Sequence, residues 1–242
     1  MLKTLILAAG KGTRMKSDLP KVVHQCMGQP MVHYVIEAAT QAGTNQVCVI
    51  LGYKANQVKD AIKEDVQYAM QTEQLGTGHA VKCAKDFIGE EGDVIILCGD
   101  TPLITGETLS KLVDMHRSGG YGVTVLSAIL EDATGYGRII RDKDNNFTKI
   151  VEQKDATEEE KAVKEINSGM YVFNAKALSE ALELINNDNA AGEYYLTDTI
   201  EIIKNKGLNV AAMPLVGAAV DEIRGVNTLE QLAEAEGIMA SR

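Results

Sequence analysis

Three short aliphatic runs in the first hundred residues limit most strictly how this chain can fold. Leu2–Leu7, Val47–Leu51 and Val94–Leu97 are rich in branched apolar residues, as strands are when both faces of their sheet are buried. Between the first two runs, Val32–Ala39 repeats apolar residues at the spacing of an amphipathic helix. Helices between buried strands indicate right-handed βαβ units, so the sequence predicts an α/β fold with a mostly parallel sheet.

The pattern changes after Gly119 and predicts a smaller mixed-sheet lobe inserted into the α/β domain. Before Gly119, further helices are expected at Ala55–Lys63, Gly78–Phe87 and Glu107–Arg117. After it, strands are expected at Gly122–Ile129, Gly137–Arg141, Phe147–Val151, Met170–Phe173 and Leu208–Met213. Helices are expected at Ala175–Ile185, Thr197–Lys206 and Leu229–Met239, a hairpin turn at Asp142–Asn146, and a solvated charged segment at Lys154–Glu165.

The charge balance limits the ligands that this chain can take. Its 24 Lys and Arg residues against 34 Asp and Glu residues give a formal net charge of −10. A chain this acidic repels a polyanion, so no nucleic-acid partner is expected. Small phosphorylated ligands stay compatible with this charge, because a few backbone amides and well-placed cations can bind them. No window approaches the roughly 18–20 apolar residues of a membrane span, so no membrane partner is expected.

The cysteines and histidines predict no metal centre of their own. The four cysteines form no C-x-x-C pair, and the four histidines lack metal-binding spacings. Cys48 and Cys98 lie in apolar runs and are expected to be buried thiols in a reducing compartment. Thr4–Gly10 is too short for a signal-peptide core, so a cytoplasmic location is expected. Surface or capping positions are expected for His24, His33, His79 and His116.

A basic, glycine-rich loop follows the first buried strand and is the strongest local motif. Gly10 and Gly12 let backbone N–H groups approach a phosphate, and Lys11 and Arg14 add positive charge. The spacing does not fit a dinucleotide fingerprint, because Met15 stands where the third glycine belongs, and it does not fit a Walker A loop. The alternative is an ordinary strand-to-helix turn.

Three further positions carry candidate polar groups. Lys21 follows Pro20, which stiffens the backbone, and is either a phosphate ligand or a surface lysine. Gln71 precedes a Leu75-Gly76-Thr77-Gly78 segment; its amide suits a nucleobase edge, while the segment also fits a helix start with Thr77 as N-cap. Asp100 ends an apolar strand, where it either holds a divalent ion or stabilises a turn before Pro102.

Together, Leu7–Met15 and the following Leu19–Val22 resemble the signature of the sugar-1-phosphate nucleotidyltransferases. The chain is most similar to the N-acetylglucosamine-1-phosphate uridyltransferase branch. The hexose uridylyl- and thymidylyltransferases place more residues between the arginine and the lysine that correspond to Arg14 and Lys21 here. Further motifs occur in the family's order: Gln74–Ala80, Cys98–Leu103, Thr134–Ile139, Val151–Ala156, Glu165–Gly169, Gly192–Asp198 and Gly225–Asn227.

This resemblance implies a Rossmann-like sheet and Mg²⁺-dependent transfer of UMP from UTP to N-acetylglucosamine-1-phosphate, with release of pyrophosphate. The nucleotide would contact Leu7, Ala8, Ala9, Gly10, Gly12, Gln71, Gly76 and Thr77. Arg14, Lys21 and Asp100 would be catalytic, Asp100 and Asn227 would hold Mg²⁺, and Gly137, Glu152 and Asn167 would bind the sugar.

Two alternatives stay open beside that function. Glucose-1-phosphate or another sugar or alcohol phosphate could replace the acetylated sugar. A non-catalytic nucleotide-sugar sensor is the alternative from a different class, and the presence of Arg14, Lys21 and Asp100 favours an enzyme over it.

The expected organisation is a single domain over residues 1–242. A nucleotide-binding half is expected at about 1–118, a sugar-binding lobe at about 119–227, and a C-terminal helix at 228–242. The bifunctional relatives continue into a β-helix acetyltransferase of hexapeptide repeats, which are absent from these residues. The chain is therefore expected to be either a part of such an enzyme or a free-standing pyrophosphorylase, and its oligomeric state is not predicted.

Overall fold

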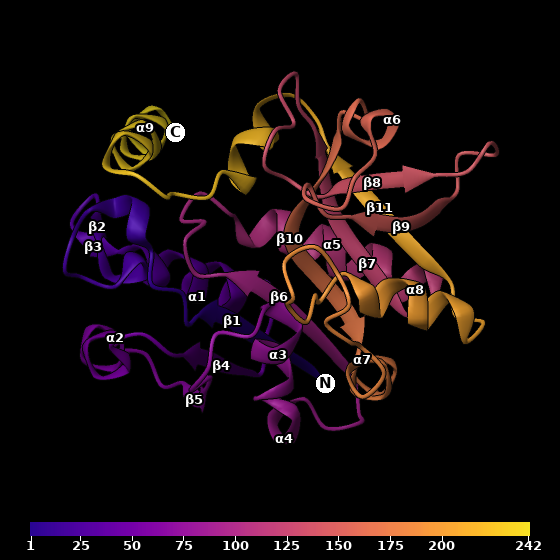
Figure 1. Ribbon diagram of the computed structural model, residues 1–242. Helices are drawn as coiled ribbons and strands as arrows, with labels where there is room; N and C mark the ends of the chain where they lie inside the picture. The colour runs from indigo at the N-terminus through magenta and orange to yellow at the C-terminus, as the bar shows by residue number, and fades with distance from the viewer.

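A nine-stranded sheet crosses the whole molecule, and the computed structural model describes all of residues 1–242 (Figure 1). Its main order is β11-β7-β10-β6-β1-β4-β5. The strands along this path are β11 (Val210–Leu215), β7 (Val123–Ile129), β10 (Glu165–Asn174), β6 (Asp93–Cys98), β1 (Leu2–Ala8), β4 (Gln46–Leu51) and β5 (Gln67–Met70). Only β10 runs antiparallel to its neighbours β6 and β7, so the sheet is mostly parallel, as the sequence predicts.

Two short strand pairs lie outside this path. The hairpin of β8 (Arg138–Arg141) and β9 (Phe147–Val151) joins the sheet where Arg138 pairs with Ile166 of β10. Its turn is the predicted Asp142–Asn146 segment, in which the Asp142 N–H donates to the Asn146 carbonyl at 2.9 Å. The second pair, β2 (Gln25–Cys26) with β3 (Gln29–Pro30), forms a separate sheet that the sequence does not predict.

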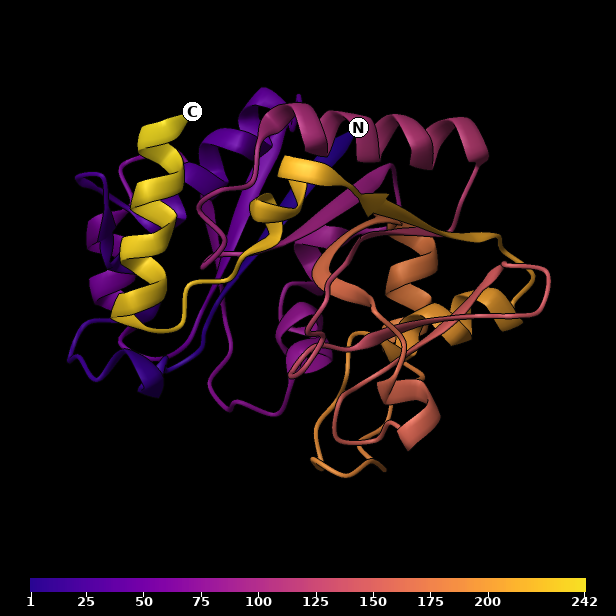
Figure 2. The ribbon, with the colours of Figure 1, turned by 90° about the horizontal axis from the view of Figure 1, so that it is seen from above.

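Helices cover both faces of the sheet (Figure 2). One face is covered by α1 (Met31–Gln41) and α5 (Gly106–Gly119), with α2 (Ala55–Ala61) near its edge. The other face is covered by α3 (Thr77–Lys82), α4 (Lys85–Ile88), α7 (Ala175–Leu182) and α8 (Asp198–Asn205). The remaining helices are α6 (Glu158–Lys161), α9 (Leu229–Ser241) and three 3₁₀ turns at Thr13–Met15, Lys21–Val23 and Gly217–Ile223.

Strand β6 shows why the predicted strands are continuously apolar. Val94 and Ile96 pack in the core on one face, while Ile95 and Leu97 pack in the core on the other. All four are fully buried, since successive side chains of a strand point to opposite faces and each face is covered by helices.

Most predicted elements are confirmed, with differences at three places. The helix expected at Gly78–Phe87 is divided into α3 and α4, which end and begin around Cys83 and Ala84. The strand expected at Met170–Phe173 begins earlier, at Glu165, and its register shifts between Asn167 and Tyr171. The charged Lys154–Glu165 segment contains the short, exposed α6 and ends at the first residue of β10. The N-terminus of α6 is closed by a capping box between Thr157 and Glu160.

Three burial expectations are wrong. His116 is 2% exposed and His24 is 7% exposed, so neither lies at the surface. His116 is held by Thr124 Oγ1, 3.0 Å from its Nδ1, and burial lowers the pKa of His24. Cys48 is buried as expected, but Cys98 is partly exposed because it is the last residue of β6 and opens into a cavity. The structure contains no helix with the length and apolar character that crossing a membrane requires.

Candidate functional site

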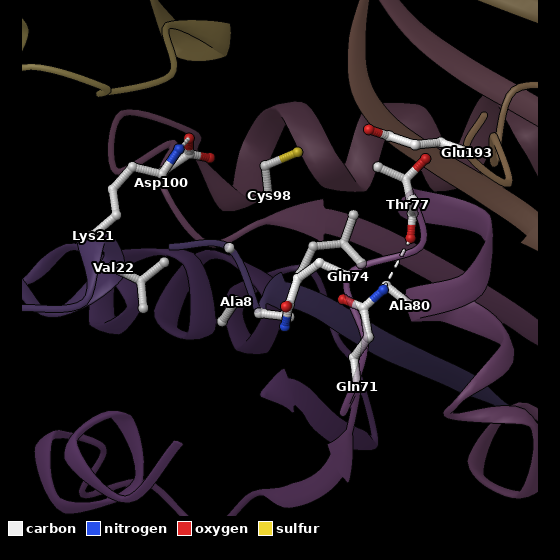
Figure 3. A pocket seen from close by; sticks show the side chains of 14 residues that line it. Ala8, Lys21, Val22, Gln71, Gln74, Thr77, Ala80, Cys98, Asp100 and Glu193 are labelled. Atoms are coloured by element: carbon white, nitrogen blue, oxygen red, sulfur yellow. Dashed lines mark hydrogen bonds and ion pairs between the residues drawn. The ribbon is translucent and has the colours of Figure 1, made fainter. Parts of the chain in front are cut away.

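A cavity of about 350 Å³ lies beyond the carboxyl ends of β1 and β6 (Figure 3). Ligands of open α/β sheets bind at this edge. Its lining consists of Leu7, Ala8, Ala9, Gly10, Lys21, Val22, Gln71, Gln74, Gly76, Thr77, Ala80, Cys98, Asp100 and Glu193. A second cavity of about 300 Å³ shares Cys98 and Asp100 and extends to Arg14, Tyr136 and Asn227. Seven of the predicted nucleotide residues thus line the first cavity; the eighth, Gly12, lines neither.

The loop after β1 needs glycine where it passes Lys21. Gly12 has a φ of +62°, and a Cβ there would lie 2.6 Å from the Lys21 Cβ. A side chain at this position would therefore be strained and would push against Lys21. At the strand end itself, the Leu7 carbonyl accepts from Gly99 N–H at 3.0 Å and the Ala9 carbonyl accepts from Tyr53 N–H at 3.1 Å, which fixes the backbone beside the cavity.

Four predicted residues from distant parts of the chain meet at one end of the cleft. The Lys21 ammonium contacts the Asp100 carboxylate and donates to Asn227 Oδ1 at 2.8 Å. Arg14 Nη2 donates to the same Asn227 oxygen at 2.9 Å. The Asp100 carbonyl accepts from Val226 N–H at 2.8 Å, which places Asn227 beside the end of β6. Figure 3 shows Lys21 and Asp100 together at one end of the first cavity.

The donor set at this point fits a divalent cation. Asp100 Oδ2 and Asn227 Oδ1 both face the Lys21 ammonium, and Asn227 Oδ1 also accepts from Arg14 Nη2. A carboxylate oxygen and an amide oxygen are hard ligands of the kind Mg²⁺ takes, and Mg²⁺ in phosphate sites uses one or two such protein groups beside water and substrate oxygens. Asn227 Nδ2 donates to the Gly225 carbonyl at 3.1 Å, so its oxygen is the atom directed at the cation.

Gln71 and the segment before α3 form the other end of the cavity. Gln71 is 4% exposed, and its Nε2 lies 3.0 Å from the Gly76 carbonyl oxygen and 3.2 Å from His79 Nδ1. The Gly76 backbone has a φ of +112°, and a Cβ there would lie 2.5 Å from the Tyr194 carbonyl oxygen. Glycine is therefore required at this position by both the backbone conformation and the lack of space.

Residues 193–196 hold that segment in place. Tyr194 N–H donates to the Leu75 carbonyl at 2.8 Å, and Gly78 N–H donates to the Tyr194 carbonyl at 2.8 Å. Leu196 N–H donates to Thr77 Oγ1 at 3.1 Å. The N-cap expectation for Thr77 is therefore wrong: Gly76 occupies the cap position, Thr77 is the first residue of α3, and its hydroxyl accepts from another segment instead.

The three predicted sugar-binding residues lie together, although they line neither cavity. Asn167 N–H donates to the Gly137 carbonyl at 2.9 Å, and a Cβ at Gly137 would lie 3.4 Å from Glu152 Oε2. Asn167 is already engaged: its Nδ2 donates to the Tyr171 hydroxyl at 2.7 Å and its Oδ1 accepts from Gly169 N–H at 3.0 Å.

Glu152 is the centre of a group of acidic side chains. Its Oε1 accepts from the Thr197 hydroxyl at 3.1 Å, and burial raises the pKa of its carboxyl. Burial, with Glu152 and Asp155 nearby, raises the pKa of Asp198 to about 6. These carboxylates destabilise one another's charged forms. The fold brings them together from different parts of the chain, so the effect is not visible in the sequence.

Thirteen lining residues are not among the predicted site residues, and four of these are Gln74, Cys98, Tyr136 and Glu193. Each of these four lies inside a motif that carries the family resemblance, so the signal was present in the sequence. Their positions at the cavities depend on how the loops return to the sheet edge, which the motifs alone do not state.

Comparisons with known proteins show which proteins this chain is similar to. The family model described as nucleotidyl transferase matches residues 3–221. The Bifunctional protein GlmU of Clostridioides difficile is 53% identical over 240 residues, which cover 99% of this chain and 52% of that protein. The Bifunctional protein GlmU of Caldanaerobacter subterraneus is 56% identical over 241 residues, which cover 100% of this chain and 52% of that protein. The chain thus spans about half the length of the curated relatives it matches.

A solved structure shows the same fold. The crystal structure of UDP-glucose pyrophosphorylase complexed with UDP-glucose aligns with a TM-score of 0.80 at 19% identity, covering 99% of this chain and 98% of that chain. At this identity the likeness establishes the α/β architecture and not the substrate.

Proposed function

The chain belongs to the nucleotidyl transferase family, and from this we propose that it transfers UMP from UTP to N-acetylglucosamine-1-phosphate, releasing pyrophosphate. The observation that carries the proposal is the convergence of Arg14, Lys21, Asp100 and Asn227 beside a cavity that Gln71 and Gly76 close at its other end. Cations and hard oxygen ligands at one end suit a triphosphate, and an amide at the other end suits a base.

The residue types match a reaction in which no protein base is needed. The second pKa of a phosphate monoester is about 6, so the attacking sugar-phosphate oxygen is already ionised near neutral pH. Arg14 and Lys21 would bind the triphosphate and the departing pyrophosphate. Asp100 and Asn227 would hold Mg²⁺, which supplies charge neutralisation at the phosphates when bound. The chain's own contribution is therefore positioning and electrostatic stabilisation.

The hydrogen bonds of Gln71 support uracil over cytosine. Both N–H groups of its amide face acceptors within the protein, the Gly76 carbonyl and His79 Nδ1. The amide oxygen is left as an acceptor for the ligand. Uracil presents a donor at N3, whereas the same position of cytosine is an acceptor, so the site as built favours the uridine nucleotide.

The sugar is proposed to bind near Gly137, Glu152 and Asn167, in the lobe at about 119–227, while residues at about 1–118 bind the nucleotide. Their proximity supports a common role, since Asn167 N–H donates to the Gly137 carbonyl and a Cβ at Gly137 would lie 3.4 Å from Glu152 Oε2. A buried carboxylate that accepts from sugar hydroxyls is a usual element of carbohydrate specificity. The cytoplasmic location expected from the sequence stays a prediction.

The direct test is pyrophosphate release with UTP and Mg²⁺ fixed and the acceptor varied. The proposal expects N-acetylglucosamine-1-phosphate to be preferred over glucose-1-phosphate and glucosamine-1-phosphate, with activity lost in EDTA. Preference for glucose-1-phosphate would keep the reaction type and overturn the substrate. Absence of pyrophosphate release with all three acceptors would overturn the proposed function.

The metal assignment is tested by Asp100→Ala. We expect a loss of turnover of about 100-fold or more, because several kcal/mol of transition-state stabilisation depend on the metal. The melting temperature is expected to change little, since Val226 bonds to the Asp100 backbone carbonyl, which the substitution keeps. Turnover equal to that of the unaltered protein would contradict the assignment.

A further inference from the structure

His79 contacts Gln71, one of the two amide side chains that line the cavity. It stands on α3, and its Nδ1 lies 3.2 Å from Gln71 Nε2. Its other ring nitrogen, Nε2, lies 3.9 Å from the sulfur of Cys83, one turn further along the chain. His79 itself does not line the cavity, so any influence on a ligand passes through Gln71.

The hydrogen-bond donors and acceptors around Gln71 determine which amide atom is the nitrogen and which ring nitrogen of His79 carries the proton. The Gly76 carbonyl can only accept, so the amide atom 3.0 Å from it must be the nitrogen. The second N–H of that nitrogen faces His79 Nδ1, which must then be the unprotonated nitrogen of the ring. The proton of the neutral imidazole consequently resides on Nε2, toward the weakly accepting sulfur of Cys83.

This arrangement leaves the Gln71 oxygen directed toward the ligand. Figure 3 shows the amide oxygen of Gln71 on the side of Gln74 and Ala8, and the nitrogen on the side of Ala80 and Thr77. If the amide rotated by half a turn while the His79 proton stayed on Nε2, its oxygen would face both the Gly76 carbonyl and the His79 lone pair. Two acceptors would then oppose a third in a buried place, which is costly.

We propose that His79 is a positioning residue that orients the Gln71 amide and so sets the pyrimidine preference of the site, selecting a base with a donor on the edge that faces Gln71. The inference rests on the proposed uridylyl transfer. Gly76 supplies one of the two acceptors through its backbone, and His79 supplies the other through a side chain. Without His79, one N–H of a 4% exposed amide loses its partner, and the rotated amide meets one opposing acceptor fewer.

Three variants separate this role from a structural one. His79→Phe keeps a planar ring beside Tyr194, whose ring centroid lies 6.5 Å away, and removes the acceptor. His79→Gln removes the ring and restores an acceptor oxygen. Cys83→Ala alters the far side of His79 and leaves the Gln71 contact in place, which makes it the matched control.

The measurement is kcat/KM for UTP and for CTP with N-acetylglucosamine-1-phosphate as acceptor. For His79→Phe we expect the UTP-to-CTP ratio to fall about tenfold, through KM for the nucleotide, with KM for the sugar phosphate unchanged. His79→Gln is expected to recover most of the ratio, and Cys83→Ala to keep it. Equal losses for UTP and CTP, with the ratio preserved, would show a merely structural role and overturn the inference.

Two outcomes distinguish this inference from the function on which it rests. If the unaltered protein transfers no uridylyl group, the proposed function is wrong and the inference falls with it. If the unaltered protein prefers UTP and His79→Phe keeps that preference, only the inference is wrong. The tautomer gives a test without any variant: ¹⁵N NMR of the ring is expected to show the proton on Nε2, and a proton on Nδ1 would overturn the proposal.

Discussion

The Lys21 ammonium contacts two acceptor oxygens, one from Asp100 and one from Asn227. Pro20 precedes this lysine with a ψ of 138°, and Lys21 then begins a 3₁₀ turn, so a short ordered segment delivers the ammonium. Its side chain is 18% exposed and that of Asp100 is 17% exposed, so the pair is partly shielded from water. A cation bound between the two oxygens has to compete with this ammonium.

That competition predicts the effect of Lys21→Met on metal binding. Methionine keeps an apolar side chain of similar length and removes the charge, so we expect Mn²⁺ to bind about tenfold more tightly in the absence of nucleotide. Turnover is expected to fall in the same variant, because the proposed phosphate contact is lost. Electron paramagnetic resonance of free Mn²⁺ measures the affinity directly.

Lys16→Met is the matched control for this measurement. It removes the same charge from an exposed residue of the preceding loop, and Lys16 has no ion pair with Asp100 or hydrogen bond to Asn227. An unchanged Mn²⁺ affinity in Lys21→Met, or an equal gain in Lys16→Met, would contradict the competition.

The raised pKa of Asp198 predicts how the stability of the protein depends on pH. Its pKa is raised from 3.8 to about 6 by burial and by Glu152, so the folded protein favours its neutral form. The stability contributed by that neutral form is complete below about pH 4 and is lost as the pH rises through about 6. In Asp198→Asn the side chain stays neutral, so the melting temperature of the variant minus that of the unaltered protein should rise between pH 4.5 and 7 and then level off. Parallel melting curves across this range would refute the assignment.

At the scale of single elements, the central strands were easier to predict than the edge strand β5 and the short β2–β3 pair. Strands β1, β4 and β6 are central and buried on both faces, so each needs a continuous aliphatic run. Strand β5 lies at the edge of the sheet, and its residues are mostly exposed, so it carries no such run. The β2–β3 pair has two residues in each strand, too few for a period to be visible.

Helix α9 offers a prediction that depends on local structure alone. Gly237 is exposed within it, and a Cβ at this position would meet nothing within 4 Å. Gly237→Ala is therefore expected to stabilise the fold by about 0.5–1 kcal/mol, because alanine restricts the unfolded chain and fits the helix. Chemical denaturation measures this free energy.

The contrasting variant is Gly120→Ala at the C-cap of α5. This position is equally open, but its φ is +58°, a conformation that favours glycine. We expect destabilisation by about 1 kcal/mol there. Changes of the same sign at both glycines would contradict the conformational argument.

At the scale of the whole molecule, strand β10 joins the two halves of the chain into one sheet. Tyr171 in this strand pairs with Ile96 of β6 on one side and with Val125 of β7 on the other. The proposed nucleotide-binding and sugar-binding parts are therefore joined by backbone hydrogen bonds within one sheet, in addition to contacts between their side chains.

A shared sheet predicts cooperative unfolding. Scanning calorimetry is expected to show one transition, with a calorimetric enthalpy equal to the van't Hoff enthalpy. Two separated transitions would mean that the halves unfold independently, and the continuous sheet would then not govern stability.

The sequence by itself determined the fold class, the order of most elements and nine of the fourteen residues that line the first cavity. Buried parallel strands demand aliphatic runs, and glycines at Gly12 and Gly76 reflect positive φ values with no room for a side chain. The aliphatic runs and the positive φ values are local requirements, so they can be read from neighbouring residues, whereas the crowding at Gly76 comes from the distant Tyr194.

Only the tertiary structure decided which of those residues meet and which atoms they present. Lys21 and Asn227 are separated by 206 positions, and they touch because strand order brings both to the end of β6. The same holds for residues 193–196, which fix the segment around Gly76, and for the acidic neighbours that raise the pKa of Asp198. Such contacts depend on the path of the chain through space, because packing between distant segments has no fixed sequence spacing.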